Sequence, residues 1–175
     1  NGIRLAAGTL VASNCIVWGH ADDIAGTPDL FYCAIQDGTG SGANGNVATD
    51  PEFADTLWYH LRSRTGYYQG GYFSGGSWTS APVHSALIDA ADPLIRPTDE
   101  PLPNGGIVNL GAYGNTEVAL RSLPLAVSNR AAVSIGSTFG TLQGRLEQVG
   151  TPDVALRFYY GLSDGGTNPL AWGGT

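Results

Sequence analysis

Two short apolar segments that recur 18 residues apart constrain the fold of this chain most. The segment Phe31–Gly38 can be laid on Asn14–His20, which pairs Cys15 with Cys33, Ile16 with Ala34 and Val17 with Ile35. An interval of this length is plausible for one coil of a solenoid, in which parallel strands stack about 4.8 Å apart. The sequence therefore predicts that equivalent residues of successive coils form ladders.

Glycine and proline interrupt the chain throughout, with 26 Gly and 10 Pro in 175 residues. Such frequent interruption favours many short strands with Gly-rich corners and argues against long helices. One expected strand is Trp58–Ser63, whose alternation would place Trp58, His60 and Arg62 on one face. We therefore expect an all-β fold.

The composition also bears on partners. The net charge is −7 and all eight basic residues are Arg, which disfavours nucleic acid and anionic membrane surfaces. No apolar run is long enough to predict a membrane span. The chain has no Met, so we expect a processed product or a piece of a longer protein, and its acidity suits a secreted protein.

The stretch from His84 to Ser122 carries three motifs in a fixed order. They are Ser85-Ala-Leu-Ile-Asp-Ala-Ala-Asp-Pro93, Glu100-Pro-Leu-Pro-Asn-Gly-Gly106 and Ile107-Val-Asn-Leu-Gly-Ala-Tyr-Gly-Asn-Thr116. This order resembles the closing turns of bacterial extracellular right-handed parallel β-helix proteins of the pectate-lyase-like superfamily. Asn14–His20, Asp50–Phe53 and Trp58–Ser63 resemble further segments of that superfamily, whereas Ala91 and Ile107 depart from its usual Gly and Arg.

This resemblance implies that residues 1–122 are the final coils of a right-handed parallel β-helix, with Asn109–Tyr113 as the last strand. It also implies a secreted or cell-surface location. It does not identify an activity, because lyases, hydrolases, adhesins and scaffolds share this fold.

The chain changes character after Leu123-Pro124. Longer runs at 132–135, 138–146 and 154–160 precede the stretch Ser163–Trp172, and Val154, Leu156, Phe158 and Tyr160 alternate with their neighbours. This pattern resembles the first half of a fibronectin-III-like or immunoglobulin-like module. Residues 123–175 are therefore expected to form an incomplete β-sandwich, because a full module needs about 100 residues.

Both ends of such a chain would present open β-edges. We consider two explanations. The chain is a fragment of a larger surface protein, or its ends are completed by neighbouring chains through strand addition, which would build a fibre head to tail.

Residues 65–80 are expected to form an aromatic hairpin inserted between coils. Such rings can stack on sugars, or they can cover one side of the solenoid as packing. The candidate carbohydrate-binding residues are Trp58, Tyr67, Tyr68, Tyr72, Phe73 and Trp78.

Four carboxylates lie within twelve residues, at Asp89, Asp92, Asp99 and Glu100. Hard oxygen ligands of this kind can bind Ca²⁺, although no EF-hand spacing is present. Alternatively, the aspartates bond to local backbone N–H groups in turns. Cys15 and Cys33 fall in one ladder, where they could form a disulfide or remain reduced as small buried hydrophobes.

No catalytic residues are identified. The three His lie far apart in the sequence, no Ser lies in a nucleophile elbow, and no Lys is available as a base. Three functions remain open: a structural or adhesive module, part of a polysaccharide lyase or glycoside hydrolase, and a polysaccharide-binding module.

Overall fold

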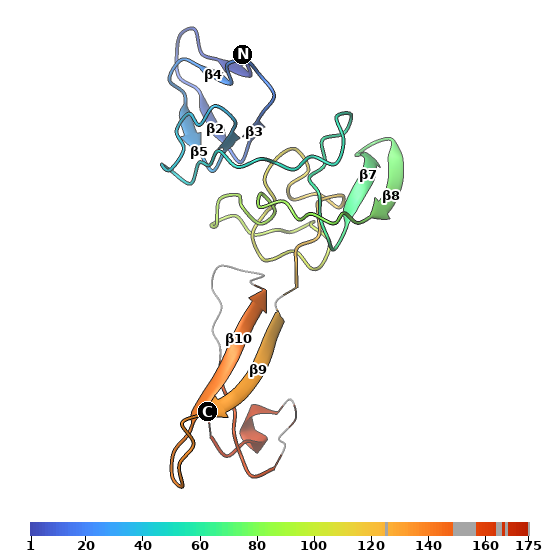
Figure 1. Ribbon diagram of the computed structural model, residues 1–175. Helices are drawn as coiled ribbons and strands as arrows, with labels where there is room; N and C mark the ends of the chain where they lie inside the picture. Colours follow the sequence, from blue (N-terminus) through green and yellow to red (C-terminus); the bar gives the residue numbers. More distant parts are fainter. Residues whose placement is uncertain (125, 149–156, 164–165, 167, 175) are drawn as a thin grey trace. The chain divides into compact units, whose positions relative to one another are not determined.

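The computed structural model describes all residues except 125, 149–156, 164–165, 167 and 175 (Figure 1). The regular elements of these described residues are ten β-strands and one 3₁₀ helix of three residues, so the chain is all-β, as predicted. It divides into two compact units, Asn1–Pro124 and Leu125–Thr175, called the N-terminal and C-terminal units below. Among the described residues, no helix has the length and apolar character needed to span a bilayer.

The N-terminal unit begins with six short strands that pair in a repeating order. They are β1 (Ile3–Arg4), β2 (Val11–Ser13), β3 (Ile16–Val17), β4 (Ile24–Ala25), β5 (Asp29–Phe31) and β6 (Ala34–Ile35). Strand β1 pairs with β4, β2 with β5 and β3 with β6, and all three pairs are parallel. We call β1–β3 the first coil and β4–β6 the second coil.

The register of the third pair confirms the alignment made from the sequence. Ile16 lies opposite Ala34 and Val17 opposite Ile35, at the predicted interval of 18 residues. Ala34 forms a further parallel bridge with Val47, so a third layer follows the second coil at this position. A three-layer ladder thus links residues from three successive parts of the chain.

Strand β6 separates two apolar cores because neighbouring residues of a strand face opposite sides. Ile35 packs with Val17, Ile24 and Leu30 in the first core. Ala34 packs with residues of the later chain in the second core, whose other buried members are Leu61, Leu87, Ile88, Leu110 and Leu120. Both residues of β6 are fully buried, so this strand joins the coils to residues 51–124.

Residues 51–124 are held mainly by turns and by side-chain bonds to the backbone. Two expected strands are wrong: 58–63 contributes only the antiparallel bridge Phe53–Leu61, and 109–113 consists of bends and turns. In the first segment Tyr59 has a φ of 58°, which interrupts an extended strand. In the second, the amide of Asn109 donates to the Glu100 carboxylate rather than to a strand.

The expected hairpin region, 65–80, holds β7 (Tyr67–Gly71) and β8 (Gly75–Thr79), which pair antiparallel (Figure 1). Tyr68 lies opposite Trp78, and Gly70 lies opposite Gly76. A Cβ on Gly70 would approach the Gly75 carbonyl oxygen and the Gly76 backbone, and its φ of 151° also favours glycine. The hairpin therefore depends on glycine at this crossing.

The C-terminal unit contains the antiparallel hairpin of β9 (Ala126–Val133) and β10 (Thr141–Gln148). A short 3₁₀ helix, η1 (Pro169–Ala171), is capped by the Asn168 side chain, which accepts a bond from the Leu170 amide at 3.1 Å. Of the expected strand at 132–135, only Ala132 and Val133 belong to a strand, and they form the end of β9. Of the expected strand at 154–160, residues 154–156 lie outside the described residues, and 157–160 form only the isolated antiparallel bridge between Tyr160 and Gly174. Residues 164, 165 and 167 of the Ser163–Trp172 motif also lie outside the described residues.

Candidate functional site

A pocket of about 510 Å³ opens on the N-terminal unit, within the range common for small-ligand sites. Its lining comes from the first coil and from residues 53–61 and 110–120. The residues are Asn14, Cys15, Ile16, Trp18, His20, Phe53, Tyr59, Leu61, Leu110, Gly111, Ala112, Tyr113 and Leu120. Aliphatic side chains, four aromatic rings and a few polar groups thus meet in one cavity.

Tyr113 is a pocket ring that is held by two contacts. It stacks on His60 with 3.6 Å between ring centroids and 14° between ring planes, and its hydroxyl donates to the Trp58 carbonyl at 2.8 Å. The ring orientation is thus fixed before any ligand arrives, which reduces the entropy lost on binding.

His60 is itself fixed from behind. It is buried, and its Nε2 lies 2.9 Å from the Gly70 carbonyl oxygen, so Nε2 carries the proton and Nδ1 is left as an acceptor. Burial lowers the pKa of His60 and raises the pKa of Tyr113. The stacked pair is therefore uncharged at neutral pH.

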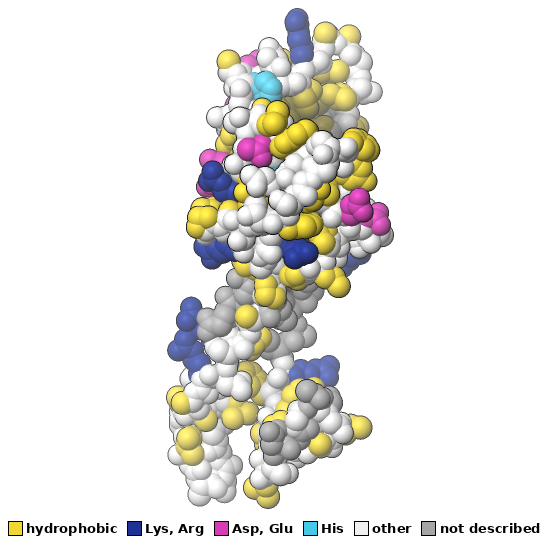
Figure 2. Space-filling view, turned by 90° about the vertical axis from the view of Figure 1, so that its right-hand side faces the viewer, with side chains coloured by type: hydrophobic (Ala, Val, Ile, Leu, Met, Phe, Trp, Pro, Cys, Tyr) yellow, Lys and Arg dark blue, Asp and Glu magenta, His cyan; other side chains and the backbone are white. Residues whose placement is uncertain are grey.

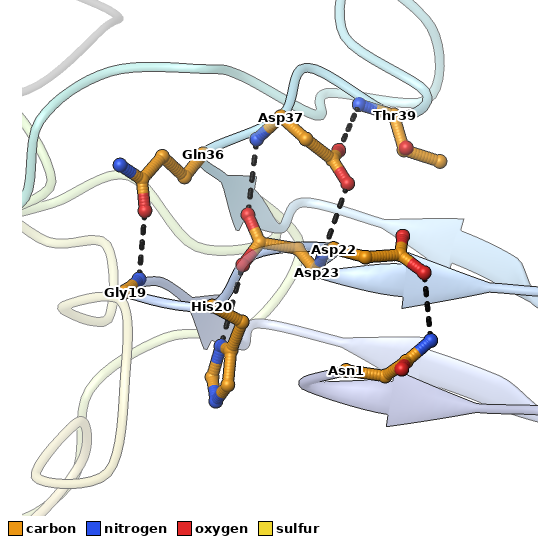
Figure 3. A network of polar contacts seen from close by, with 8 residues as sticks. All are labelled: Asn1, Gly19, His20, Asp22, Asp23, Gln36, Asp37 and Thr39. Atoms are coloured by element: carbon orange, nitrogen blue, oxygen red, sulfur yellow. Dashed lines mark hydrogen bonds and ion pairs between the residues drawn. The ribbon is translucent and has the colours of Figure 1, made fainter.

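A polar network at the ends of β3 and β6 orients His20, another pocket residue (Figure 3). His20 Nδ1 lies 3.3 Å from the carboxylate of Asp23, which is fully buried. Asp23 and Asp37 bond reciprocally: each carboxylate accepts from the other's amide, at 3.0 and 3.1 Å. The contact with Asp23 uses Nδ1 of His20 and does not involve Nε2, the other ring nitrogen.

Asn14 connects the first coil to the opposite wall of the pocket. Its side-chain oxygen accepts from the Asp92 amide at 2.8 Å, and its carbonyl accepts from the Gly111 amide at 3.1 Å. Its φ of 55° is a conformation that Asn tolerates better than most residues. These bonds hold the two sides of the pocket together.

The six predicted carbohydrate-binding residues do not line this pocket. Tyr67 packs on the second core, and Trp58 lies against Gly71. Only Tyr72, Phe73 and Trp78 are exposed among the six.

The rings of the hairpin are inclined to one another. Tyr68 meets Trp78 at 70°, and Tyr72 meets Phe73 at 80°. The Arg121 guanidinium lies 4.5 Å from the centre of the Trp78 ring. The hairpin therefore does not present one flat surface for a sugar chain.

The four predicted calcium ligands have separate partners. Asp92 accepts from the Leu94 amide, and Asp99 accepts from the Thr98 hydroxyl. In the part of the chain that the structure describes, no three His, Cys, Asp or Glu side chains come together as a metal site. Asp92 thus makes the local turn bond that the sequence offered as the alternative.

Asp89 and Glu100 behave differently from the other two carboxylates. Asp89 accepts from the Ser122 hydroxyl at 2.7 Å, and burial, opposed by this bond, raises the pKa of Asp89 to about 7. Glu100 is buried, which raises its pKa; one oxygen accepts from the Asn109 and Asn115 amides, and the other has no partner. These groups fasten the loops of 85–122 to one another.

Cys15 and Cys33 are free thiols in adjacent coils. Cys33 is fully buried, whereas Cys15 reaches the pocket. The ladder predicted for the two residues is present, and the disulfide is not formed in this structure.

Comparisons with protein-family models, with curated proteins and with solved structures find no match. Interpretation of the pocket thus rests on its own geometry. No sequence motif groups Trp18, Phe53, Tyr59 and Tyr113. They come from distant segments without a shared motif, and only the fold brings them together.

Proposed function

We propose that the chain is a structural or adhesive module of a bacterial extracellular surface protein. In this proposal the N-terminal unit is the end of a right-handed parallel β-helix, and the C-terminal unit is part of a fibronectin-III-like or immunoglobulin-like sandwich. The observation that carries the proposal is the repeated parallel pairing of β1–β3 with β4–β6 in the same order.

The outer edge of the first coil supports a role in association. The amides of Ile3 and Leu5 donate to the second coil. Because successive residues of a strand point their backbone groups to opposite edges, the Arg4 amide faces the other way. The same alternation applies to β2, where the Leu10 carbonyl accepts from the second coil and the exposed Val11 follows it. Such an edge can accept a further strand, whether from the same chain or from another chain.

The C-terminal unit supports the same role. Its described residues form one two-stranded sheet, with Val127, Val133 and Leu142 exposed. Figure 2 shows hydrophobic side chains at the surface of this unit and of the N-terminal unit. Exposed apolar residues on a narrow sheet favour association with a further strand or sheet.

Sedimentation velocity over a wide range of protein concentration tests this proposal. We expect the unmodified chain to form oligomers that grow with concentration, visible as filaments by electron microscopy. Arg4→Pro and Val11→Pro remove outward amides and should weaken association at least about tenfold. The matched variants Arg4→Ala and Val11→Ala retain the amides and should associate normally. A monomer at every concentration, or equal association of Pro and Ala variants, would contradict the proposal.

A second candidate function is binding of a neutral polysaccharide. The pocket suits this binding better than the hairpin does. The fixed ring of Tyr113 offers a stacking surface, while Trp18, Phe53 and Tyr59 add aromatic walls. His20 and Asn14 add polar groups at the same cavity. Flat rings with a few polar groups suit the apolar face and hydroxyls of a sugar ring.

Two pairs of substitutions locate such binding, with a glycan array to find ligands and NMR titration to measure affinity. Trp18→Leu and Tyr113→Phe change the pocket, whereas Tyr72→Ala and Phe73→Ala change the exposed hairpin turn. Pocket binding predicts a loss of affinity of about tenfold for Trp18→Leu and none for the hairpin variants. Loss in the hairpin variants alone would place the sugar at residues 65–80, and no glycan signal would remove this candidate.

A further inference from the structure

The register of the first two coils places Cys15 beside Cys33. Each cysteine directly precedes a paired residue, Ile16 and Ala34, and the Ala34 amide donates to the Cys15 carbonyl at 2.9 Å. Neighbouring strands lie about 4.8 Å apart, and the Cα atoms of bridged cysteines lie about 4.4–6.8 Å apart. The backbone therefore holds the two residues at a separation that a disulfide can span.

The side chains also point in suitable directions. The Cys33 sulfur lies 3.5 Å from the Ala12 carbonyl oxygen of the first coil and 3.4 Å from the Phe31 carbonyl oxygen of its own coil. The Cys15 sulfur donates to the Ser13 carbonyl at 3.1 Å, and Cys15 packs against the apolar core that contains Cys33. The two side chains therefore lie on the same side of the coils.

The two neighbouring thiols shift each other's pKa. The adjacent Cys15 side chain lowers the pKa of Cys33 to about 6, whereas the adjacent Cys33 and burial raise the pKa of Cys15. The first proton therefore leaves the pair more easily than the second, because a second thiolate beside the first is disfavoured.

Access to the pair is one-sided. Cys33 is fully buried, whereas Cys15 is partly exposed and lines the pocket described above. A small reagent in the pocket can therefore contact Cys15 and is shielded from Cys33. Redox-reactive cysteines are accessible to solvent and often lie next to a second cysteine that resolves the first adduct.

We propose that Cys15 and Cys33 form a modification site, at which a small-molecule disulfide converts the two thiols into one intramolecular disulfide between the first and second coils. After the first proton has left the pair, transfer of the second to Cys33 leaves Cys15 as thiolate, which attacks the reagent disulfide, forms a mixed disulfide and releases one reagent thiolate. Cys33 then loses this proton, attacks the Cys15 sulfur and releases the second reagent thiolate. Counted from two protonated thiols, the protein loses two protons and two electrons, and the two reagent thiolates take up the two protons to become thiols.

Oxidised glutathione is the test reagent, and intact mass without reductant is the readout. We expect the mass of the unmodified chain to fall by about 2 Da, without formation of disulfide-linked dimers. Digestion should then release a peptide pair linked through Cys15 and Cys33. The melting temperature of the oxidised chain should rise by several °C, because the bridge closes a loop in the unfolded state.

Two single substitutions separate the steps, with circular dichroism to confirm that each variant is folded. Cys33→Ser should stop at a mixed disulfide, with a mass gain of about 305 Da, because no resolving thiol remains. Cys15→Ser should react at least about tenfold more slowly, because Cys33 is shielded. The proposal is overturned if the unmodified chain keeps both thiols, stops at the glutathione adduct or forms only intermolecular bridges. Equal reactivity of Cys15→Ser and the unmodified chain would also overturn it.

Discussion

Tyr113 stacks on His60 at 3.6 Å between ring centroids, with its hydroxyl bonded to the Trp58 carbonyl. This relationship joins the segment 58–60 to the end of the loop region and forms the back of the pocket. It also places two titratable groups in contact while keeping both uncharged, because burial lowers the pKa of His60 and raises that of Tyr113.

Substitution of Tyr113 separates the hydroxyl bond from the ring contact. Tyr113→Phe loses one hydrogen bond and should lower the free energy of unfolding by about 1 kcal/mol. Tyr113→Leu also loses the aromatic pair and should cost about 1–2 kcal/mol more. Urea unfolding measures both values, with Tyr72→Phe in the exposed turn as a control. Equal costs for the Phe and Leu variants would show that the stack adds nothing.

Among the polar residues between the second coil and the third layer, Asn46 is predicted to be the one whose substitution lowers the free energy of unfolding most. It is buried; its side chain accepts from the Cys33 amide and donates to the Leu30 carbonyl, both at 2.9 Å. Asn46→Ala leaves the Cys33 amide without its side-chain partner and the Leu30 carbonyl with only the longer bond from Asn44, at 3.4 Å, and should cost about 1–3 kcal/mol of unfolding free energy. Ser41→Ala, in the exposed loop nearby, should change it by less than about 0.5 kcal/mol. Similar small effects at both positions would refute the bridging role of Asn46.

The contribution of Asp89 to the free energy of unfolding is predicted to fall as pH rises. Its pKa is about 7 in the folded chain against 3.8 for the free side chain, so between these values the folded state binds more protons than the unfolded state. The unfolding free energy contributed by this group therefore falls as pH rises from about 4 to 7. Asp89→Asn should remove this decrease in unfolding free energy, because the amide does not titrate. Asn also tolerates the φ of 58° at this position.

Urea unfolding of the Asp89→Asn variant and the unmodified chain at pH 5 and pH 8 tests this prediction. Relative to the unmodified chain, the variant should gain about 1–2 kcal/mol between the two pH values, a figure reduced for the partial exposure of Asp89. Ser122→Ala removes the bond that opposes the shift and should move the transition to higher pH. A stability difference that is the same at both pH values would contradict the raised pKa.

The parallel ladder could be predicted from the sequence because strand register follows the apolar pattern. Ile16 and Val17 match Ala34 and Ile35 in polarity and spacing, and the fold uses that match. The extended segments expected at 58–63 and 109–113 failed for a different reason. A left-handed residue at Tyr59 and carboxylate bonds to the Asn109 amide replace strand pairing there, and periodicity signals neither.

The pocket was beyond sequence reasoning for a related reason. Trp18 and Tyr113 are brought together by long-range bonds such as those of Asn14 to Asp92 and Gly111. Each of these bonds depends on turn conformations at single residues. The aromatic residues of 65–80 were easier to notice because they are adjacent in sequence, yet the hairpin turns their rings in different directions.

The stacking of parallel coils is the central claim, and interstrand nuclear Overhauser effects in the isotope-labelled protein test it most directly. We predict contacts between the backbone protons of Cys15–Val17 and those of Cys33–Ile35 in the pattern of parallel strands. Contacts from Ala34 to Val47 should extend the same ladder. An antiparallel pattern between these segments, or helical contacts along residues 9–47, would contradict the account.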